Sequence, residues 1–252
     1  MNRTTYTGKF FETIRAGARS SANEVVPIIL QLVQPKSVVD IGCGDGTWLS
    51  VFRDQGVLDI VGLDGDYVNP ELLQIAPDQF RPTDLSSPFE LCRTFDLAVS
   101  LEVAEHLPPQ SAEGFVHSLT ELAPVSLFSA AIPLQGGTQH LNEQWPDYWS
   151  RLFKIHNYLT IDCVRGRIWG NEQVEWFYAQ NMLLFVHEDR LRGDAALCRH
   201  HDQTKLQQLA LVHPKRFVQP FRCGVRAALR LLAVAAANAV RKRIRVLPGE
   251  RY

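Results

Sequence analysis

Cysteine is scarce in this sequence and is not arranged in pairs. The 252 residues include five cysteines, and no two of them form a C-x-x-C motif. They are Cys43, Cys92, Cys163, Cys198 and Cys223. A disulfide framework or a structural zinc site needs paired or closely spaced cysteines, so the pattern argues against both. We expect reduced thiols, as in a cytosolic protein.

The chain also lacks a long apolar run near its first residue. The segment MNRTTYTGKFFETIRAGARS has no apolar stretch of the kind found in a signal peptide, so export is not expected. Together with the cysteines, this predicts a cytoplasmic location. Internal repeats and low-complexity segments are absent from the sequence as well. A length of 252 residues fits one large α/β domain, or a domain with an appendage.

Acidic residues are almost absent from the end of the chain. From Lys215 onward there are ten Lys or Arg residues and one acid, Glu250, whereas the preceding residues hold 16 basic and 26 acidic residues. A nucleic-acid-binding domain would carry its basic surface on the folded site, so no nucleic-acid partner is expected. The basic end is better suited to contact with an anionic surface.

The composition of Val225–Val240 is that of a helix, and the basic stretch Arg241–Arg245 follows it. This helix is shorter than the roughly 20 apolar residues of a membrane span and contains two arginines, so it is not expected to cross a bilayer. It could lie on the inner face of the membrane and bind anionic lipid. Docking on its own domain and contact with a second copy are the alternatives.

Short apolar runs alternate with helical stretches along most of the sequence. A capping box at Ser21–Glu24 predicts a helix that ends near Val33. Strands are predicted at Ser37–Ile41, Ile60–Leu63, Leu97–Leu101, Val125–Ile132, Leu159–Val164 and Asn181–His187, the last as an antiparallel edge hairpin. Apolar strands separated by helices are typical of a parallel sheet that is covered on both faces.

The most informative segment reads VVDIGCGDGTWL from position 38. An apolar strand that contains Asp40 runs into Gly42, Gly44 and Gly46, and a helix follows. Glycines allow a sharp turn and the close approach of a ligand at the carboxyl ends of the strands. A dinucleotide fingerprint, G-x-G-x-x-G, would require glycine where Thr47 stands. The carboxylate of Asp40 also suits an ammonium group better than a pyrophosphate, which argues against a nicotinamide dehydrogenase.

The string D-I-G-C-G-D-G resembles motif I of the class I methyltransferases that use S-adenosylmethionine (SAM). Three later segments resemble that family in order: Ile60–Gly65, Arg81–Leu85 and Phe95–Glu102. The resemblance covers roughly residues 20–190. It implies a Rossmann-like sheet of seven mostly parallel strands with an antiparallel edge strand, and an enzyme that transfers the methyl group of SAM.

The resemblance also implies which residues bind the cofactor. Asp64 would accept hydrogen bonds from both ribose hydroxyls, since a carboxylate has two oxygens. Asp84 corresponds to the acid that contacts the adenine amino group, and the strand that ends near Glu102 runs beneath the methionine moiety. The full cofactor-binding set is Asp40, Gly42, Cys43, Gly44, Gly46, Thr47, Asp64, Gly65, Asp84, Leu85 and Glu102.

A second group of reactive side chains follows the fourth strand in the string E-V-A-E-H-L-P. Glu102, Glu105 and His106 stand at i, i+3 and i+4, which share one face of a helical turn. His106 could be a general base, because imidazole titrates near neutral pH. The three side chains could instead bind a divalent cation, or the carboxylates could cap the helix while His106 packs beneath the cofactor. The sequence leaves these alternatives open.

An E-x-x-E-H string at this position is similar to those of the ubiquinone-biosynthesis O-methyltransferases and the small-RNA 2′-O-methyltransferases. That resemblance implies Mg²⁺ bound by Glu102, Glu105 and His106 and by a further histidine beyond the fifth strand. His140 is the candidate, although the loop around it differs from theirs. The cation could hold two vicinal hydroxyls and lower the pKa of the one that attacks. Glu105, His106 and His140 are therefore the candidate catalytic residues.

Large aromatic residues are dense between Gln144 and Tyr178. Rings flanked by Asn142, Glu143, Asn171 and Gln180 suit a molecule with apolar C–H faces and hydroxyls, such as a sugar, although each ring could equally belong to the core. The stretch Pro133–Trp149 also resembles one in bacterial methyltransferases near surface-polysaccharide genes. We expect O-methylation of a glycan, a glycolipid or another small polar acceptor. A quinone or phenol O-methyltransferase and a non-catalytic SAM-binding protein at the membrane surface are the alternatives.

These observations divide the chain into three parts. Residues 1–20 are predicted to form an N-terminal segment. Residues 21–190 are predicted to form the SAM-dependent methyltransferase domain, with an aromatic-rich insertion at 133–180. Residues 191–252 are predicted to form a basic helical extension. The sequence gives no indication of the oligomeric state.

Overall fold

The computed structural model describes residues 8–218, with side chains from Arg15 onward. The chain divides into two compact units, Met1–His213 and Pro214–Tyr252, so the predicted boundary at residue 190 falls inside the first unit. Of the second unit only the short helix α9 (Pro214–Val218) is described. The helix predicted at Val225–Val240 lies outside the described residues, and its contact with lipid stays a prediction. None of the described helices has the length and apolar character needed to cross a membrane.

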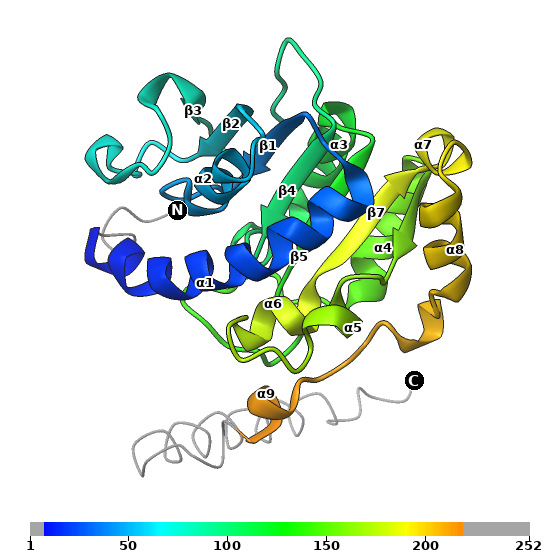
Figure 1. The fold of residues 1–252 in the computed structure, drawn as a ribbon. Helices are drawn as coiled ribbons and strands as arrows, with labels where there is room; N and C mark the ends of the chain where they lie inside the picture. Colours follow the sequence, from blue (N-terminus) through cyan, green and yellow to red (C-terminus); the bar gives the residue numbers. More distant parts are fainter. Residues whose placement is uncertain (1–7, 219–252) are drawn as a thin grey trace, which may run out of the picture. The chain divides into compact units, whose positions relative to one another are not determined.

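Seven strands form one sheet in the order β3-β2-β1-β4-β5-β7-β6 (Figure 1). Neighbouring strands from β3 to β5 are parallel, whereas β7 is antiparallel to both β5 and β6. The predicted Rossmann-like α/β sheet of mostly parallel strands is therefore confirmed. The antiparallel strand β7 lies one place in from the edge, which β6 occupies. The strands are β1 (Ser37–Ile41), β2 (Asp59–Asp64), β3 (Phe80–Pro82), β4 (Leu97–Leu101), β5 (Val125–Ser129), β6 (Tyr158–Ile161) and β7 (Leu183–His187).

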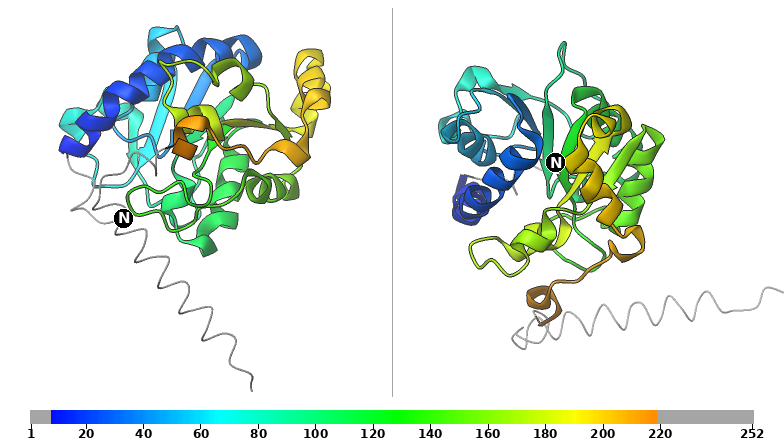
Figure 2. Two further views of the ribbon diagram at one scale, coloured as in Figure 1. Left: turned by 90° about the horizontal axis from the view of Figure 1, so that it is seen from below. Right: turned by 45° about the vertical axis from the view of Figure 1, so that its right-hand side comes forward.

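Helices cover both faces of this sheet (Figure 2). One face packs against α1 (Gly8–Val33) and α2 (Thr47–Asp54), and the other against α3 (Ala112–Leu122) and α4 (Pro146–Ile155). Side chains alternate between the two core clusters along each strand, so that Val38 faces the first and Val39 the second. The remaining elements are α5 (Arg165–Ile168), α6 (Trp176–Asn181), α7 (Glu188–Arg192), α8 (Ala195–Gln203) and the 3₁₀ turns η1 (Pro70–Leu72), η2 (Pro77–Gln79), η3 (Ala104–His106), η4 (Pro109–Ser111) and η5 (Leu206–Gln208).

The first helix begins at Gly8, so the start predicted at Ser21 is wrong. Ser21 is fully buried within α1, and its hydroxyl donates to the carbonyl oxygen of Gly17 at 2.7 Å. The same hydroxyl accepts the backbone N–H of Glu175 at 2.9 Å. The Ser21 hydroxyl, which the sequence pattern predicted as a helix cap, therefore bonds the preceding turn of the same helix and a distant loop. The part of α1 that precedes Ser21 carries Arg15, which donates to Asp45 in the loop after β1 at 2.6 Å.

Aromatic rings fill the core between the sheet and α4. Phe185 of β7 and Phe153 of α4 are stacked, with ring centroids 3.9 Å apart and planes at 8°. Phe128 of β5 contacts both rings, and it also contacts Trp149, which is 2% exposed. Trp149 is thus a core residue, not part of an acceptor surface.

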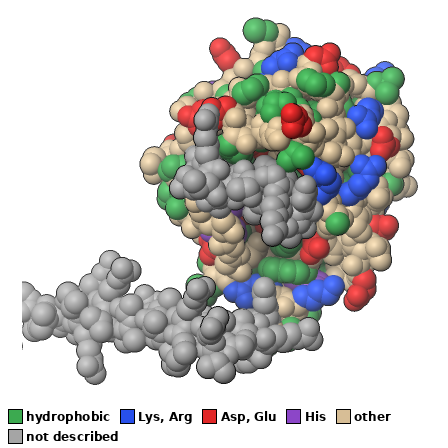
Figure 3. All heavy atoms as spheres, turned by 90° about the vertical axis from the view of Figure 1, so that its left-hand side faces the viewer, with side chains coloured by type: hydrophobic (Ala, Val, Ile, Leu, Met, Phe, Trp, Pro, Cys, Tyr) green, Lys and Arg blue, Asp and Glu red, His purple; other side chains and the backbone are tan. Residues whose placement is uncertain are grey.

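On the face seen in Figure 3, acidic and basic side chains of the described residues are interspersed. Exposed apolar side chains occur in the loop between β5 and α4. Leu134 is 82% exposed, Leu141 59% and Trp145 39%. Scattered exposed apolar residues are common on protein surfaces, so these exposures alone assign no contact to the loop.

The stacked pair gives a test of this fold. Phe185→Ala should lower the free energy of unfolding by about 3–5 kcal/mol, because it removes a fully buried ring and leaves a cavity beside Phe153. Urea denaturation followed by circular dichroism measures the change. Leu58→Ala is the control, since Leu58 is 74% exposed and its loss should change stability by less than about 0.5 kcal/mol. Equal effects of the two substitutions would contradict the packing described here.

Candidate functional site

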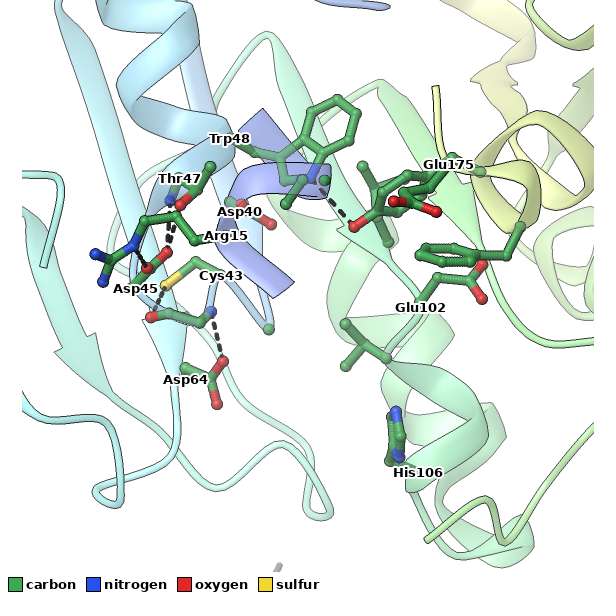
Figure 4. Close-up of a pocket in the computed structure, with 18 of the residues that line it drawn as sticks. Arg15, Asp40, Cys43, Asp45, Thr47, Trp48, Asp64, Glu102, His106 and Glu175 are labelled. Carbon is green, nitrogen blue, oxygen red and sulfur yellow. Dashed lines mark hydrogen bonds and ion pairs between the residues drawn. The ribbon is translucent and has the colours of Figure 1, made fainter. Parts of the chain in front are cut away.

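A cavity of about 370 Å³ opens at the carboxyl ends of β1, β2 and β4 (Figure 4). Its lining includes nine of the residues predicted to form the site: Asp40, Gly42, Cys43, Gly44, Thr47, Asp64, Leu85, Glu102 and His106. Gly46, Gly65 and Asp84 are adjacent in sequence to lining residues but do not line the cavity themselves. The structure therefore brings together most of the predicted cofactor-binding set.

The floor of the cavity is a turn that only glycine accommodates easily. Gly42 has φ +84°, and a Cβ atom there would lie 2.4 Å from a methyl carbon of Val103. Gly46 has φ +78°, precedes the first turn of α2, and would place a Cβ atom 2.9 Å from Ile75. A side chain at either position would suffer backbone strain and a clash at once. The glycines predicted from the sequence are thus required by the backbone conformation and by packing.

Asp64 at the end of β2 ties this turn to the neighbouring loop. One carboxylate oxygen accepts the backbone N–H of Gly44 at 2.7 Å. The other accepts the N–H of Gly65 at 2.7 Å and the hydroxyl of Tyr67. Burial raises the pKa of Asp64, although these hydrogen bonds lower it in part. Its position beside the cavity fits the predicted contact with a diol such as ribose.

Asp40 faces the same cavity from β1. Burial raises its pKa well above the usual value, and the nearby charge of Asp64 raises it further. Burial likewise raises the pKa of the Cys43 thiol, and the described cysteines are all free. Two buried carboxyl groups at one cavity favour a ligand that carries positive charge, because such a ligand would stabilise their ionised forms.

Asp84 is exposed and lies outside the cavity. Its carboxylate accepts the backbone N–H of Ser86 at 3.0 Å and the hydroxyl of Ser86 at 2.6 Å, and these bonds lower its pKa. The adjacent Leu85 does line the cavity. A contact of Asp84 with adenine therefore stays a prediction, while Leu85 supplies an apolar wall.

Several residues outside the predicted cofactor-binding set also line the cavity, and they come from distant parts of the chain. Arg15 of α1 donates to Asp45 of the glycine turn at 2.6 Å. From the α6 region, Tyr178 lines the cavity and accepts the indole N–H of Trp48 at 3.4 Å. Glu175 and Phe177 complete this side of the cavity. Only tertiary folding brings these residues to the glycine turn, and no local motif marks them.

The second predicted group of side chains, Glu102, Glu105, His106 and His140, comes together only in part. Glu105, His106 and His140 place ligand atoms within 4.8 Å of one another, but Glu102 is not among them. Residues 104–106 form the 3₁₀ turn η3, not the α-helical turn on which the i, i+3, i+4 prediction was based. The imidazoles of His106 and His140 pack edge to face, with centroids 4.9 Å apart. The structure therefore places His140 beside Glu105 and His106, and a role of these residues as metal ligands stays a prediction.

Glu105 is fully buried, and neither of its carboxylate oxygens has a well-formed hydrogen bond to a described residue. Burial raises its pKa well above the usual value, and the nearby Glu102 raises it further. Burial lowers the pKa of His106 to about 4, with a further contribution from His140. His106 is therefore neutral at pH 7, with a lone pair on one ring nitrogen.

Glu102 is held by a buried network of amide side chains. Its carboxylate accepts Gln135 Nε2 at 2.8 Å and Asn181 Nδ2 at 3.0 Å. Gln180 donates to Gln135 and to Asn181, which closes the network. Glu102 has φ +56°, so its backbone is strained where the carboxylate turns toward the cavity. Burial raises its pKa, and the bonds from Asn181, Ser129 and Gln135 lower it in part.

The predicted acceptor-facing residues do not form one surface. Trp149 is in the core, Gln180 belongs to the buried amide network, and Asn142 is buried. Asn171 donates to Glu24 of α1 at 2.8 Å. Of this aromatic-rich segment, only Phe177 and Tyr178 line the cavity together with Glu175.

Comparison with known proteins places this geometry in a family context. Residues 14–162 match the model of a family described as a methyltransferase domain. A search of curated proteins found no significant match. Among solved structures, magnesium protoporphyrin IX methyltransferase (ChlM) from Synechocystis PCC 6803, with bound S-adenosylhomocysteine (SAH), is similar with a TM-score of 0.52. The two are 19% identical, over 72% of this chain and 89% of that one.

Two further solved structures share the fold. Streptomyces venezuelae DesVI has a TM-score of 0.54 and 14% identity, over 71% of this chain and 96% of that one. SAM-bound CalS10, an amino pentose methyltransferase from Micromonospora echinaspora, has a TM-score of 0.51 and 13% identity, over 71% and 96% of the two chains. At these identities the likeness is one of fold.

The carboxylate at the end of β2 gives a test of the cavity. Asp64→Asn should weaken SAH binding roughly 10- to 100-fold, because hydrogen bonds to a charged group are worth about 1.5–3 kcal/mol. Isothermal titration calorimetry measures the dissociation constant. Asp66→Asn is the matched control, since Asp66 is exposed and does not line the cavity. Unchanged affinity in the Asp64 variant would exclude a role for this carboxylate in cofactor binding.

Proposed function

The chain belongs to the methyltransferase domain family and is a SAM-dependent methyltransferase, and we propose that it methylates a hydroxyl group of a glycan, a glycolipid or another small polar acceptor. A single observation carries this proposal. The cavity extends from Asp64 to His106, and His106 also belongs to the cluster with Glu105 and His140. A cofactor whose ribose is held by Asp64 and whose methionine moiety lies along β4 would present its methyl group beside that cluster.

Bound SAM supplies an electrophilic methyl carbon on a positively charged sulfur. In the proposed transfer, the acceptor oxygen would form a bond to this carbon while the carbon–sulfur bond breaks, and the sulfur would keep the electron pair. The hydroxyl proton must leave in the same process. Positioning the oxygen in line with the carbon–sulfur bond can contribute roughly 7–11 kcal/mol. We propose that His106 and the side chains clustered with it orient the acceptor hydroxyl and bring about the removal of its proton.

Two ways of removing the proton agree with the geometry. His106 is neutral at pH 7 and could accept the proton directly. A divalent cation held by Glu105, His106 and His140 would instead lower the pKa of the hydroxyl. The burial of Glu105, which raises its pKa well above the usual value, favours the cation, because a positive charge beside the carboxylate would offset the cost of burying it.

The residues present fit such a cation. One carboxylate and two imidazoles lie within 4.8 Å of one another, a set that divalent metals bind. Because imidazole is a softer ligand than the oxygen atoms that Mg²⁺ prefers, Mn²⁺ should bind at least as tightly as Mg²⁺. In this proposal Glu102 is not a ligand, and its carboxylate, held by two amides, faces the cofactor side of the cavity.

The surroundings of His140 support a sugar-like acceptor. Leu134, Leu141 and Trp145 are exposed on the loop that carries this histidine. An exposed indole and two aliphatic side chains suit the C–H faces of a sugar ring, and vicinal hydroxyls suit a divalent cation. One solved protein with this fold is described as an amino pentose methyltransferase. The same surface would also accept a phenol, so a catechol is the second acceptor to examine.

Metal removal tests the proton-removal step. Protein treated with EDTA should lose most of its methyl transfer to acceptors with vicinal hydroxyls, and added Mn²⁺ or Mg²⁺ should restore it. Turnover is measured with radiolabelled SAM on a panel of glycosides and catechols. SAH binding should persist in EDTA, because Asp64 and the glycine turn do not belong to the cluster. Full activity in chelator would eliminate the cation and leave His106 as the base.

Substitution of His106 separates an enzyme from a non-catalytic cofactor-binding protein. His106→Ala should lower turnover at least ~100-fold under either proton-removal scheme. His117→Ala is the matched control, since His117 is an exposed histidine of α3 outside the cavity. If no acceptor is methylated by the unaltered protein while SAH binds, the acceptor proposal fails and only cofactor binding stands.

A further inference from the structure

A single carboxylate organises the loop that carries His140. Glu143 accepts the backbone N–H of Leu134 at 2.7 Å with one oxygen. With the other oxygen it accepts the N–H of Gly136 at 2.8 Å and bonds His140 Nδ1 at 2.9 Å. Glu143 thus ties the beginning of the loop to its end and to the imidazole at the same time. Its side chain is 20% exposed, so water screens these bonds only in part.

The His140 ring is also confined by its neighbours. A Cβ atom at Gly137 would lie 2.1 Å from His140 Nε2, so the ring packs directly over the glycine backbone. The edge-to-face contact with His106 limits rotation on another side. With Nδ1 bonded to Glu143, the ring has little freedom to turn over.

The loop is anchored to the opposite member of the cluster as well. The backbone N–H groups of Leu141 and Asn142 both donate to the carbonyl oxygen of Glu105, at 2.7 and 2.9 Å. Gln144 N–H donates to the carbonyl oxygen of Ala131 at 3.2 Å. The backbone of Glu105 and the segment that carries His140 are therefore joined directly, and their relative position is fixed without help from a ligand.

The contact with Glu143 favours one tautomer of His140. An ionised carboxylate only accepts hydrogen bonds, so the 2.9 Å contact is a hydrogen bond when His140 Nδ1 carries the proton. In neutral histidine this leaves the lone pair on Nε2, the remaining nitrogen. A histidine that binds a metal commonly donates its other nitrogen to a carboxylate in this way, which fixes both the ring orientation and the tautomer.

We propose that Glu143 is a positioning residue, which holds His140 with its proton on Nδ1 so that the Nε2 lone pair is available to the cluster with Glu105 and His106. This inference rests on the proposed function in one respect only, namely that the Nε2 lone pair binds the proposed cation. The tautomer itself is a property of the protein alone.

Nitrogen-15 NMR of the imidazole side chains tests the tautomer without acceptor or cofactor. In the unaltered protein, His140 should show a protonated Nδ1 and an unprotonated Nε2, with its signals assigned by their loss in His140→Gln. In Glu143→Gln the proton should move toward Nε2, because the amide can donate to Nδ1. A His140 that carries its proton on Nε2 in the unaltered protein would overturn the inference, and this measurement needs no substitution of Glu143.

Metal binding gives the second readout. Mn²⁺ titrated calorimetrically should bind Glu143→Gln about 10- to 100-fold more weakly than the unaltered protein. SAH affinity should be the same in both, which shows that the variant is folded. Asp147→Asn is the matched control, because Asp147 is an exposed partner of Arg151 on α4 and should leave both affinities unchanged.

The possible results separate the inference from the proposed function. If the tautomer is as expected but the unaltered protein binds no Mn²⁺, the cation of the proposed function fails and the positioning role stands. If Mn²⁺ binds but Glu143→Gln changes neither the tautomer nor the affinity, the positioning role fails and the cation stands. A loss of SAH binding together with Mn²⁺ binding would show that Glu143 has only a structural role, which also overturns the inference.

Discussion

The site depends on the hydrogen bond between the Asp64 carboxylate and the backbone N–H of Gly44. This bond joins the end of β2 to the glycine turn that follows β1, and it holds that turn open above the sheet. The turn can take this form because Gly42 tolerates a positive φ. Gly42 also contacts Val103 closely, so the residues that follow β4 lie next to the turn. Three neighbouring strand ends thus meet at one cavity because one carboxylate and one glycine connect them.

Two glutamates three residues apart, one partly buried and one fully buried, have different surroundings, and this separates their roles. Glu102 receives two amide donors from Gln135 and Asn181, so its position is fixed by the protein. Glu105 is more deeply buried and has no comparable donors among the described residues. The first is arranged to remain a fixed acceptor beside the cofactor. The second is the carboxyl group that the proposed cation would contact.

The sequence predicts the parts of the structure that depend on neighbouring residues. Strands β1 and β4, the three glycines and Asp64 follow from apolar runs and a local motif, and the structure has them in place. The three-residue strand β3 was missed because two of its residues are exposed and give no apolar run. The true start of α1 was missed because Ser21 bonds a loop more than 150 residues away. Tyr178 and the amide network depend on tertiary contacts that no local pattern records.

The reversed direction of β7 determines which neighbouring residues lie at the site. The residues that directly follow β1, β2 and β4 lie at the edge of the sheet where the cavity opens. Because β7 is antiparallel to β5, the segment that precedes it, with Tyr178 and Asn181 of α6, arrives at that edge instead. Changes in α6 can therefore alter the wall opposite the glycine turn while the cofactor motif stays intact. The cavity therefore has one wall built by the local glycine motif and another built by the segment that precedes β7.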